Sequence, residues 1–310
     1  MRVSAVPGEA FAIRHLLERA SPFLYIVPAL AVFTLFTLYP IVANVGISFL
    51  HYSFSGMSFA GLANYRTLVS DPVFWQSVGN SLLWVVGTLA AQLTLGYLLA
   101  WLIEEFVPLG RGFFRTIFFL PMVITPSVIS IVFSTIYSPD YGLLYGTWEH
   151  FLPNVAFPGF LSAPSLVTWS LILVNVWQWT GFFVLLYVAG LGQISSDIRE
   201  AARLDGAKPG AVSRFVYLPM LRPTHLTLLL LGTIQALQQF PLVYLITNGG
   251  PDNASQIMGT YVFQQGFIYN NLGYASTVAV SLFVLALGLA VLELRVVGGR
   301  FEIGGQAVER

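Results

Sequence analysis

Charged side chains are scarce in this sequence, since Asp, Glu, Lys and Arg make up only 9% of it. Three stretches hold the polar residues that matter most for its chemistry. The segment 200–219, EAARLDGAKPGAVSRFVYLP, holds several charged residues between long apolar runs, and this pattern favours contact with another protein. The runs NVWQWTGFF and IQALQQF place uncharged amides near aromatic rings, a mixture that can bind sugar hydroxyls and the apolar faces of sugar rings.

The sequence lacks the residues of several common active sites. It contains no Cys, its four His residues are scattered, and it has no serine-nucleophile or paired-carboxylate pattern, so we predict no catalytic residue and no metal site. A phosphate-binding G-x-x-x-x-G-K-[ST] loop is missing, because the single Lys, Lys208, is followed by Pro209. The formal net charge of zero gives no general attraction to nucleic acid. We therefore expect a chain that is not an enzyme by itself and binds no cofactor of its own.

The elements that must position the polar residues are long apolar helices. The chain is 56% hydrophobic with a mean hydropathy of +0.75, which is typical of an integral membrane protein. A helix crosses a bilayer with about 20 apolar residues, so we predict an all-α fold with six spans. Their interiors contain no Asp, Glu, Lys or Arg, and they lie near 23–49, 78–103, 114–137, 167–192, 219–246 and 274–294.

Basic residues are distributed unevenly between the segments that join these spans. Thirteen of the 14 Lys and Arg residues fall on one side of the predicted spans, and Arg66 alone falls on the other. The positive-inside rule therefore predicts that both termini are cytoplasmic. The predicted organisation is a cytoplasmic N-terminal segment 1–21, a six-span domain 22–298 and a cytoplasmic tail 299–310. The outer segments are long and aromatic, which favours short interfacial helices that act as membrane anchors, as a docking surface, or as both.

The charged segment lies in a predicted cytoplasmic loop at 195–219. Positive-inside bias explains its basic residues but not its helix signals. Asp197 with Glu200 predicts a capped helix start, Gly206 predicts a turn with positive φ, and Pro209 predicts the first turn of a second helix. The second helix would carry an apolar stripe of Val212, Phe215 and Val216. We expect a helix–turn–helix that fits a groove of another protein.

The same segment resembles a known sequence motif. Glu200-Ala201-Ala202, then Gly206, then Val216-x-Leu218-Pro219 match the EAA motif, EAA-x3-G-x9-I-x-LP, of ABC importer permeases, with Val in place of Ile. The stretches GLANYRTLVSDPVFWQSVGNS, RTIFFLPMVITPSV, LITNGGP and GYASTVAVSLF are similar to the carbohydrate-uptake branch, the maltose and glycerol-phosphate type permeases. The resemblance covers roughly residues 22–298 and implies the type I ABC importer permease fold.

The resemblance implies that 195–219 is the coupling segment, which seats on a separate ATPase subunit. Glu200 would make a polar contact with the ATPase, and Gly206 would allow the turn between the two short helices. The other residues implied in this contact are Ala201, Ala202, Leu204, Asp205, Phe215 and Pro219. The implied partners are a second homologous permease, a dimer of cytoplasmic ATPases that bind ATP and Mg, and an extracytoplasmic substrate-binding protein. The implied location is the plasma (inner) membrane of a bacterium or archaeon.

The resemblance also places substrate contacts on the spans 167–192 and 219–246. Asn175 and Phe182 match such positions, and Gln235 and Gln239 match them approximately, because the alignment of the second span shifts by one residue. Further candidates are Gln178, Trp179 and Gln238. The alternative is that the amides form hydrogen bonds between helices, within this chain or with a partner permease.

The expected activity is ATP-driven import of a sugar along a path formed by the spans. No positive charge lies in the spans to balance an anion, which favours a neutral sugar over glycerol 3-phosphate, although a partner could supply an Arg. A stand-alone secondary carrier is a further alternative. Ion-coupled carriers usually place ionisable residues inside the bilayer, and the predicted span interiors hold none.

Overall fold

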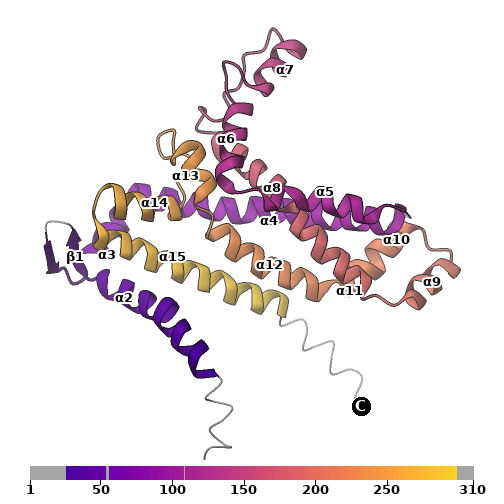
Figure 1. Cartoon of the computed structure of the whole chain (residues 1–310), viewed down its shortest axis with the longest axis horizontal. Coiled ribbons are helices and arrows are strands. Elements are labelled where there is room, and N and C mark those ends of the chain that lie inside the picture. The colour runs from indigo at the N-terminus through magenta and orange to yellow at the C-terminus, as the bar shows by residue number, and fades with distance from the viewer. Residues whose placement is uncertain (1–25, 54–55, 108, 299–310) are drawn as a thin grey trace, which may run out of the picture.

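The computed structural model describes residues 26–53, 56–107 and 109–298. The predicted terminal segments 1–21 and 299–310 lie outside the described residues. Most of the described chain is helical, and the long helices run side by side between two ends (Figure 1). We call the end that carries α9, α10 and α11 the basic end, and the end that carries the β-hairpin and α3 the hairpin end.

The described elements follow in chain order, with η marking a π-helical turn. They are η1 (Thr34–Leu38), α2 (Tyr39–Ile47), β1 (Leu50–Ser53), β2 (Gly56–Phe59), α3 (Ala63–Ser70), α4 (Pro72–Phe106), α5 (Arg111–Val123), α6 (Pro126–Ile136), α7 (Leu143–Phe151), α8 (Val167–Gly192), α9 (Ser196–Leu204), α10 (Pro209–Val212), η2 (Ser213–Tyr217), α11 (Leu218–Met220), α12 (Arg222–Leu237), α13 (Pro241–Thr247), α14 (Met258–Phe263), η3 (Gln264–Ile268), α15 (Leu272–Glu293) and η4 (Leu294–Gly298). The strands β1 and β2 are antiparallel, with Leu50 opposite Phe59.

Two of the six predicted spans are bent. Within the described residues, four helices are long and apolar enough to cross a membrane, and the number rises to six if each bent pair counts as one span. The predicted span 114–137 is not one straight helix, because α5 and α6 meet at 94°. Pro126 begins α6 and disfavours helical geometry at Thr125, which is extended. The chain also bends where Pro241 begins α13, since α12 and α13 differ in direction by 40°.

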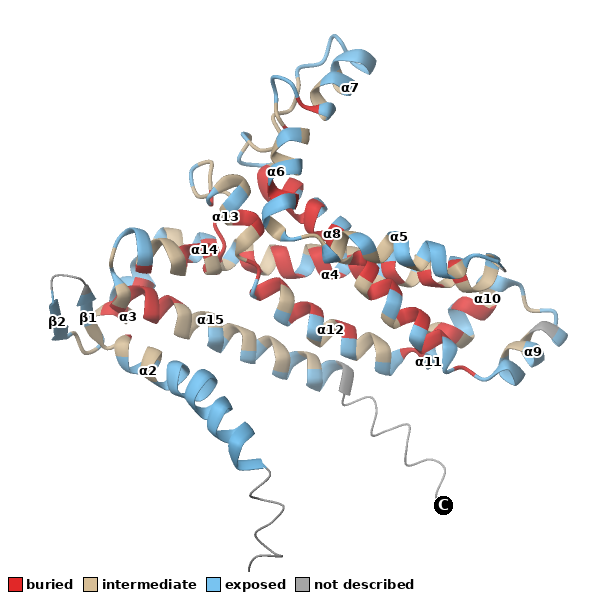
Figure 2. Ribbon diagram, in the orientation of Figure 1, coloured by how far each residue is buried: buried red, intermediate tan, exposed pale blue. Residues whose placement is uncertain are grey.

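The core of the bundle is the central helix α8 with α4, α5 and α12 packed around it (Figures 1 and 2). Glycines allow these helices to approach each other closely. A Cβ at Gly181 would lie 1.9 Å from the carbonyl oxygen of Phe118, and one at Gly96 would lie 2.6 Å from Cβ of Phe183. Small residues at such crossings let helix backbones approach each other, which favours helix association inside a membrane.

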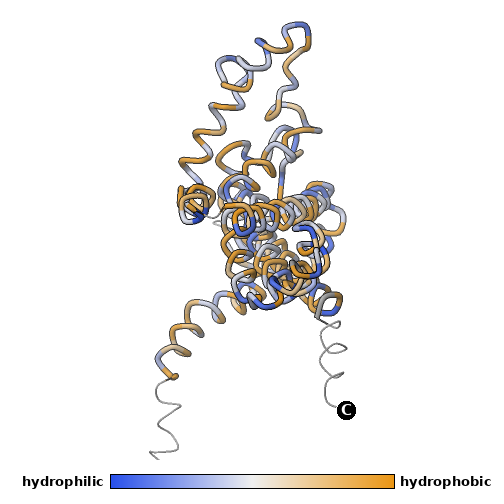
Figure 3. The backbone as a smooth tube through the Cα atoms, turned by 90° about the vertical axis from the view of Figure 1, so that its right-hand side faces the viewer, coloured by the Kyte–Doolittle hydropathy of each residue, from blue (hydrophilic) through white to orange (hydrophobic). Residues whose placement is uncertain are grey.

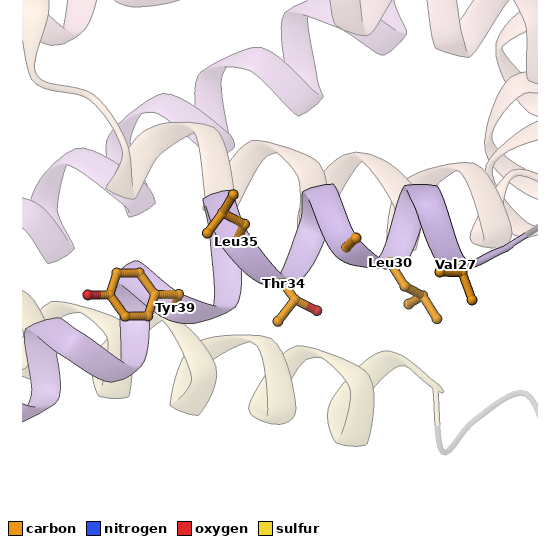
Figure 4. A pocket seen from close by; sticks show the side chains of 6 residues that line it. Val27, Leu30, Thr34, Leu35 and Tyr39 are labelled. Carbon is orange, nitrogen blue, oxygen red and sulfur yellow. The ribbon is translucent and has the colours of Figure 1, made fainter.

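The first helix, Ile26–Ile47, is the least covered part of the bundle. No residue in its most apolar window is buried, and its N-terminal part diverges from α15 (Figure 1). Its colouring is mostly hydrophobic (Figure 3). A hollow of about 460 Å³ on its surface is lined only by residues of this helix, among them Leu30 and Tyr39 (Figure 4). This hollow is therefore an uncovered helix face rather than an enclosed site.

A carboxylate fastens the helices together at the hairpin end. Asp71 caps α4 by accepting bonds from the amides of Val73 (2.9 Å) and Phe74 (3.3 Å), and it also accepts bonds from the hydroxyls of Tyr261 and Tyr274. Burial acts to raise the pKa of Asp71, but these four hydrogen bonds outweigh it and hold the pKa below its usual value. Asp71 thus ties α4 to α14 and α15.

Candidate coupling segment and amide cluster

The first helix of the segment 195–219 begins one residue earlier than the predicted cap. The hydroxyl of Ser195 accepts a bond of 3.2 Å from the amide of Asp197, so Ser195 occupies the N-cap position and α9 begins at Ser196. The prediction of Asp197 as the cap was wrong. Its carboxylate lies in the first turn instead, where it interacts favourably with the helix dipole.

The turn after α9 has the geometry that the sequence predicts. Gly206 has a φ of +74°, in the left-handed region that favours glycine. The amide of Ala207 donates to the carbonyl of Ala202 at 3.0 Å, which is the longer bond of a Schellman helix end. A Cβ at Gly206 would meet nothing within 4 Å, so the requirement for glycine there comes from the backbone conformation alone.

The second helix of the segment buries some of its side chains in the bundle and exposes the others. Val212, Ser213 and Tyr217 are buried, whereas Phe215 is 72% exposed with Arg214 stacked at 5.6 Å from its ring centre. Pro209 begins α10, as expected. The prediction of one apolar stripe was wrong, because the π-helical turn η2 changes the side-chain spacing and sends Phe215 away from the buried residues.

The exposed face of the segment carries most of the predicted coupling residues. Leu204 is 89% exposed, and α9 stands clear of the bundle at the basic end (Figure 2). Ala202 is half-buried, and the other exposed members are Glu200, Ala201, Asp205, Phe215 and Pro219. Two large apolar side chains, Leu204 and Phe215, are therefore left without cover beside charged neighbours, which suits a surface that another protein covers.

The amides predicted to contact substrate lie at helix interfaces. The side chain of Asn175 on α8 accepts a bond of 3.1 Å from the amide nitrogen of Gln92 on α4, and both residues are buried. Gln178 is also buried, and its amide lies 3.4 Å from the carbonyl oxygen of Ile124, at the break between α5 and α6. These contacts favour the alternative in which the two α8 amides join helices.

The amides of α12 are more available for a ligand. Gln239 is buried at the break between α12 and α13, and Gln238 beside it is exposed. The side-chain nitrogen of Gln235 is buried with no hydrogen-bond partner among the described residues. On α8, Trp179 and Phe182 are half-buried. The structure therefore places these candidates near two helix breaks, but it does not bring all of them into one enclosed pocket.

Two functional candidates were missed in the sequence. Gln92 was overlooked although an amide inside the apolar run 78–103 is as unusual as those of the other spans. Glu104 near the end of α4 accepts a bond of 3.2 Å from Arg111 and one of 2.5 Å from Arg115, so these arginines are paired at the basic end. In the sequence, Arg111 and Arg115 indicated only the orientation of the spans in the membrane, and their pairing with Glu104 was not predicted.

Comparison with known proteins agrees with this arrangement. The family model "Binding-protein-dependent transport system inner membrane component" matches residues 92–296. A probable ABC transporter permease protein, YurN of Bacillus subtilis, is 35% identical over 279 residues, covering 88% of this chain and 94% of that protein. The lactose transport system permease protein LacF of Rhizobium radiobacter is 33% identical, covering 87% and 90%.

A solved structure shows the same fold. It is a bacterial alginate ABC transporter in complex with an alginate pentasaccharide-bound periplasmic protein, with a TM-score of 0.79 and 22% identity, covering 90% of this chain and 94% of the matched chain. The family match and the several long apolar helices together identify a multi-pass membrane protein. The chain belongs to the family of binding-protein-dependent transport system inner membrane components, the permease subunits of ABC transporters.

Proposed function

We propose that this chain is the permease subunit of an ATP-driven importer for a sugar and that its segment 195–219 couples it to a separate ATPase. The observation that carries this proposal is the helix–turn–helix at the basic end, which leaves Leu204 and Phe215 uncovered. Membership of the permease family supplies the context for that surface. The ATPase itself, with its ATP and Mg, is a separate chain.

The proposed topology has six spans, with both termini and the basic end in the cytoplasm. Each bent pair, α5–α6 and α12–α13, then counts as one span. The charge distribution supports this orientation. Among the described residues, Arg199, Lys208, Arg214 and Arg222 lie in or beside the coupling segment, whereas Arg66 lies in α3 at the hairpin end.

The proposed complex contains a second permease, two ATPase subunits and an extracytoplasmic substrate-binding protein. The uncovered face of the helix Ile26–Ile47 offers apolar surface to a second permease or to lipid. At α7 the chain projects beyond the bundle with exposed Tyr141, Leu143 and Phe151 nearby, which suits docking of an external protein (Figure 1). The matched alginate transporter was solved with its periplasmic protein.

The proposed substrate is a neutral mono-, di- or oligosaccharide. The lactose in the name of one relative supports a neutral saccharide. Gln235 and Gln239 remain the best candidates for sugar contacts, because they lie on or beside the bent end of α12 and no described side chain pairs with the nitrogen of Gln235. Broken helices near the membrane centre are a common setting for transporter binding sites. Glycerol 3-phosphate is the alternative substrate.

The test is uptake by the assembled complex. The chain is purified in mild detergent with the subunits that accompany it, reconstituted in proteoliposomes and assayed with lactose, maltose, trehalose and glycerol 3-phosphate. We expect uptake of at least one saccharide that requires ATP and the binding protein. Uptake driven by an ion gradient without ATP would refute the proposal, and ATP-dependent uptake of glycerol 3-phosphate alone would establish the alternative.

A further inference from the structure

We propose that Tyr97 on α4 and Ser213 in η2 form a joint that passes movement of the coupling segment to the transmembrane bundle. The two residues contact each other across 116 positions of sequence. They act as positioning residues, because neither lies on the exposed face that would meet the ATPase. The inference rests on the proposed coupling function and adds the place where the segment is attached to a span.

The coupling segment consists of a free part and a fixed part. From Ser196 to Gly210 every described side chain is exposed or half-buried. From Val212 onwards the segment enters the bundle, where Val212, Ser213, Tyr217 and Leu221 are buried. A force applied to α9 by an ATPase therefore reaches the spans through the region around Ser213, through the end of α8, and through the half-buried Ala202 and Ala207, which pack against the core.

Ser213 and Tyr97 form a two-bond contact at the start of the fixed part. The Tyr97 hydroxyl donates to the backbone carbonyl of Ser213 at 3.2 Å, and the two hydroxyls are 2.6 Å apart, which allows the serine to donate in return. Tyr97 lies in the C-terminal third of α4, the long helix that packs along α8. The contact therefore joins the coupling segment to a core helix of the bundle near the basic end.

The surroundings of Tyr97 make these hydrogen bonds important for its position. The Tyr97 side chain lines a groove of about 410 Å³ with Leu93, Leu98 and Leu218, so packing does not enclose it completely. Tyr187 lines the same groove, and its ring meets that of Tyr97 edge-on at 5.6 Å between centres. Tyr187 is itself held by a hydrogen bond of 2.7 Å to His225, at the beginning of α12. The joint thus reaches α4, α8 and α12.

The test separates coupling from folding by measuring ATP hydrolysed per sugar molecule imported. Tyr97→Phe removes both hydrogen bonds, whereas Ser213→Ala removes only the bond between the two hydroxyls, and both replacements keep the size of the side chain nearly unchanged. Ser213→Thr keeps the hydroxyl and serves as the rescue variant. Thr94→Val is the matched control, because Thr94 lines the same groove but bonds only within its own helix, to Ala90 at 2.7 Å.

We expect Tyr97→Phe to raise the ATP-to-sugar ratio about fivefold or more, because the net loss of a single hydrogen bond changes an equilibrium or rate by about that factor. Ser213→Ala should raise the ratio by less, because Tyr97 can still donate to the backbone carbonyl of residue 213. Binding of the ATPase should stay unchanged, and Ser213→Thr and Thr94→Val should behave as wild type. The assay uses whichever of lactose, maltose or trehalose is transported fastest, with ATPase activity in the absence of sugar as a second readout.

The outcomes distinguish this inference from the proposed function. Unchanged ratios and unchanged sugar-free ATPase activity in both hydroxyl-deleting variants would overturn the joint, even if the ATPase binds the coupling segment. A loss of ATPase binding in both would also overturn it, because the contact would then only shape the docking surface. Failure of the proposed function would appear differently, as no ATP-dependent uptake by the wild-type complex.

Discussion

The replacement Leu204→Ala tests whether the exposed face of α9 is the surface that binds the ATPase. Leu204 is 89% exposed, so almost all of its side chain is available for burial by a partner. The replacement removes Cγ and both Cδ carbons, each worth about 0.8 kcal/mol when buried. Burial of the exposed 89% of this side chain in an ATPase groove would therefore make the replacement cost about 2 kcal/mol, or about 30-fold in Kd.

The assay is titration of the purified ATPase against the permease in nanodiscs, with Kd as the readout. Leu109→Ala is the matched control, because Leu109 is 87% exposed and follows α4 at the same end of the bundle but lies outside the segment 195–219. We expect Leu204→Ala to weaken binding about 30-fold and Leu109→Ala to have little effect. Equal Kd values for the two variants would refute the assignment of α9 as the docking helix.

Three further predictions follow from single residues. Gly206→Ala should reduce uptake about 5- to 30-fold, because a non-glycine residue at positive φ costs about 1–2 kcal/mol. The control Gly210→Ala, in α10, should leave uptake unchanged. Equal uptake by the two variants would contradict the role of the Gly206 turn. Gly181→Ala should lower the yield and melting temperature of the purified chain, since its Cβ would overlap the backbone of Phe118, and a wild-type melting temperature would contradict the packing of α5 on α8. The melting temperature of the wild type should fall as the pH drops below about 4, because the Asp71 carboxylate has a lowered pKa and its stabilising effect is lost when it is protonated. The melting temperature of Asp71→Asn should fall less over the same pH range. Parallel pH profiles for the two proteins would exclude Asp71 as the cause.

The sequence predicted best what depends on local backbone chemistry. Gly206 permits a left-handed turn because it has no Cβ, and Pro209 favours a helix start because its ring fixes φ. Both predictions are confirmed. The 94° bend between α5 and α6 was not predicted, although Pro126 is visible in the sequence, because the apolar composition on both sides indicated only that the stretch could cross a membrane.

Contacts between distant residues could not be predicted in the same way. Asn175 was correctly identified as unusual, but nothing in the sequence shows that Gln92, which lies 83 positions away, is its partner. The same holds for Tyr97 and Ser213, whose pairing depends on how α4 packs beside the coupling segment. The separation of Phe215 from Val212 depends on a π-helical turn. The spacing of apolar residues does not distinguish that turn from an ordinary α-helical one.

The most direct test of the central claim is the accessibility of position 204 in membrane vesicles. The chain contains no Cys, so Leu204→Cys introduces a single thiol that a membrane-impermeant reagent can label. We predict labelling in inside-out vesicles, protection by the bound ATPase, and no labelling in right-side-out vesicles. Labelling of intact right-side-out vesicles, or labelling that the ATPase does not reduce, would contradict a cytoplasmic coupling segment.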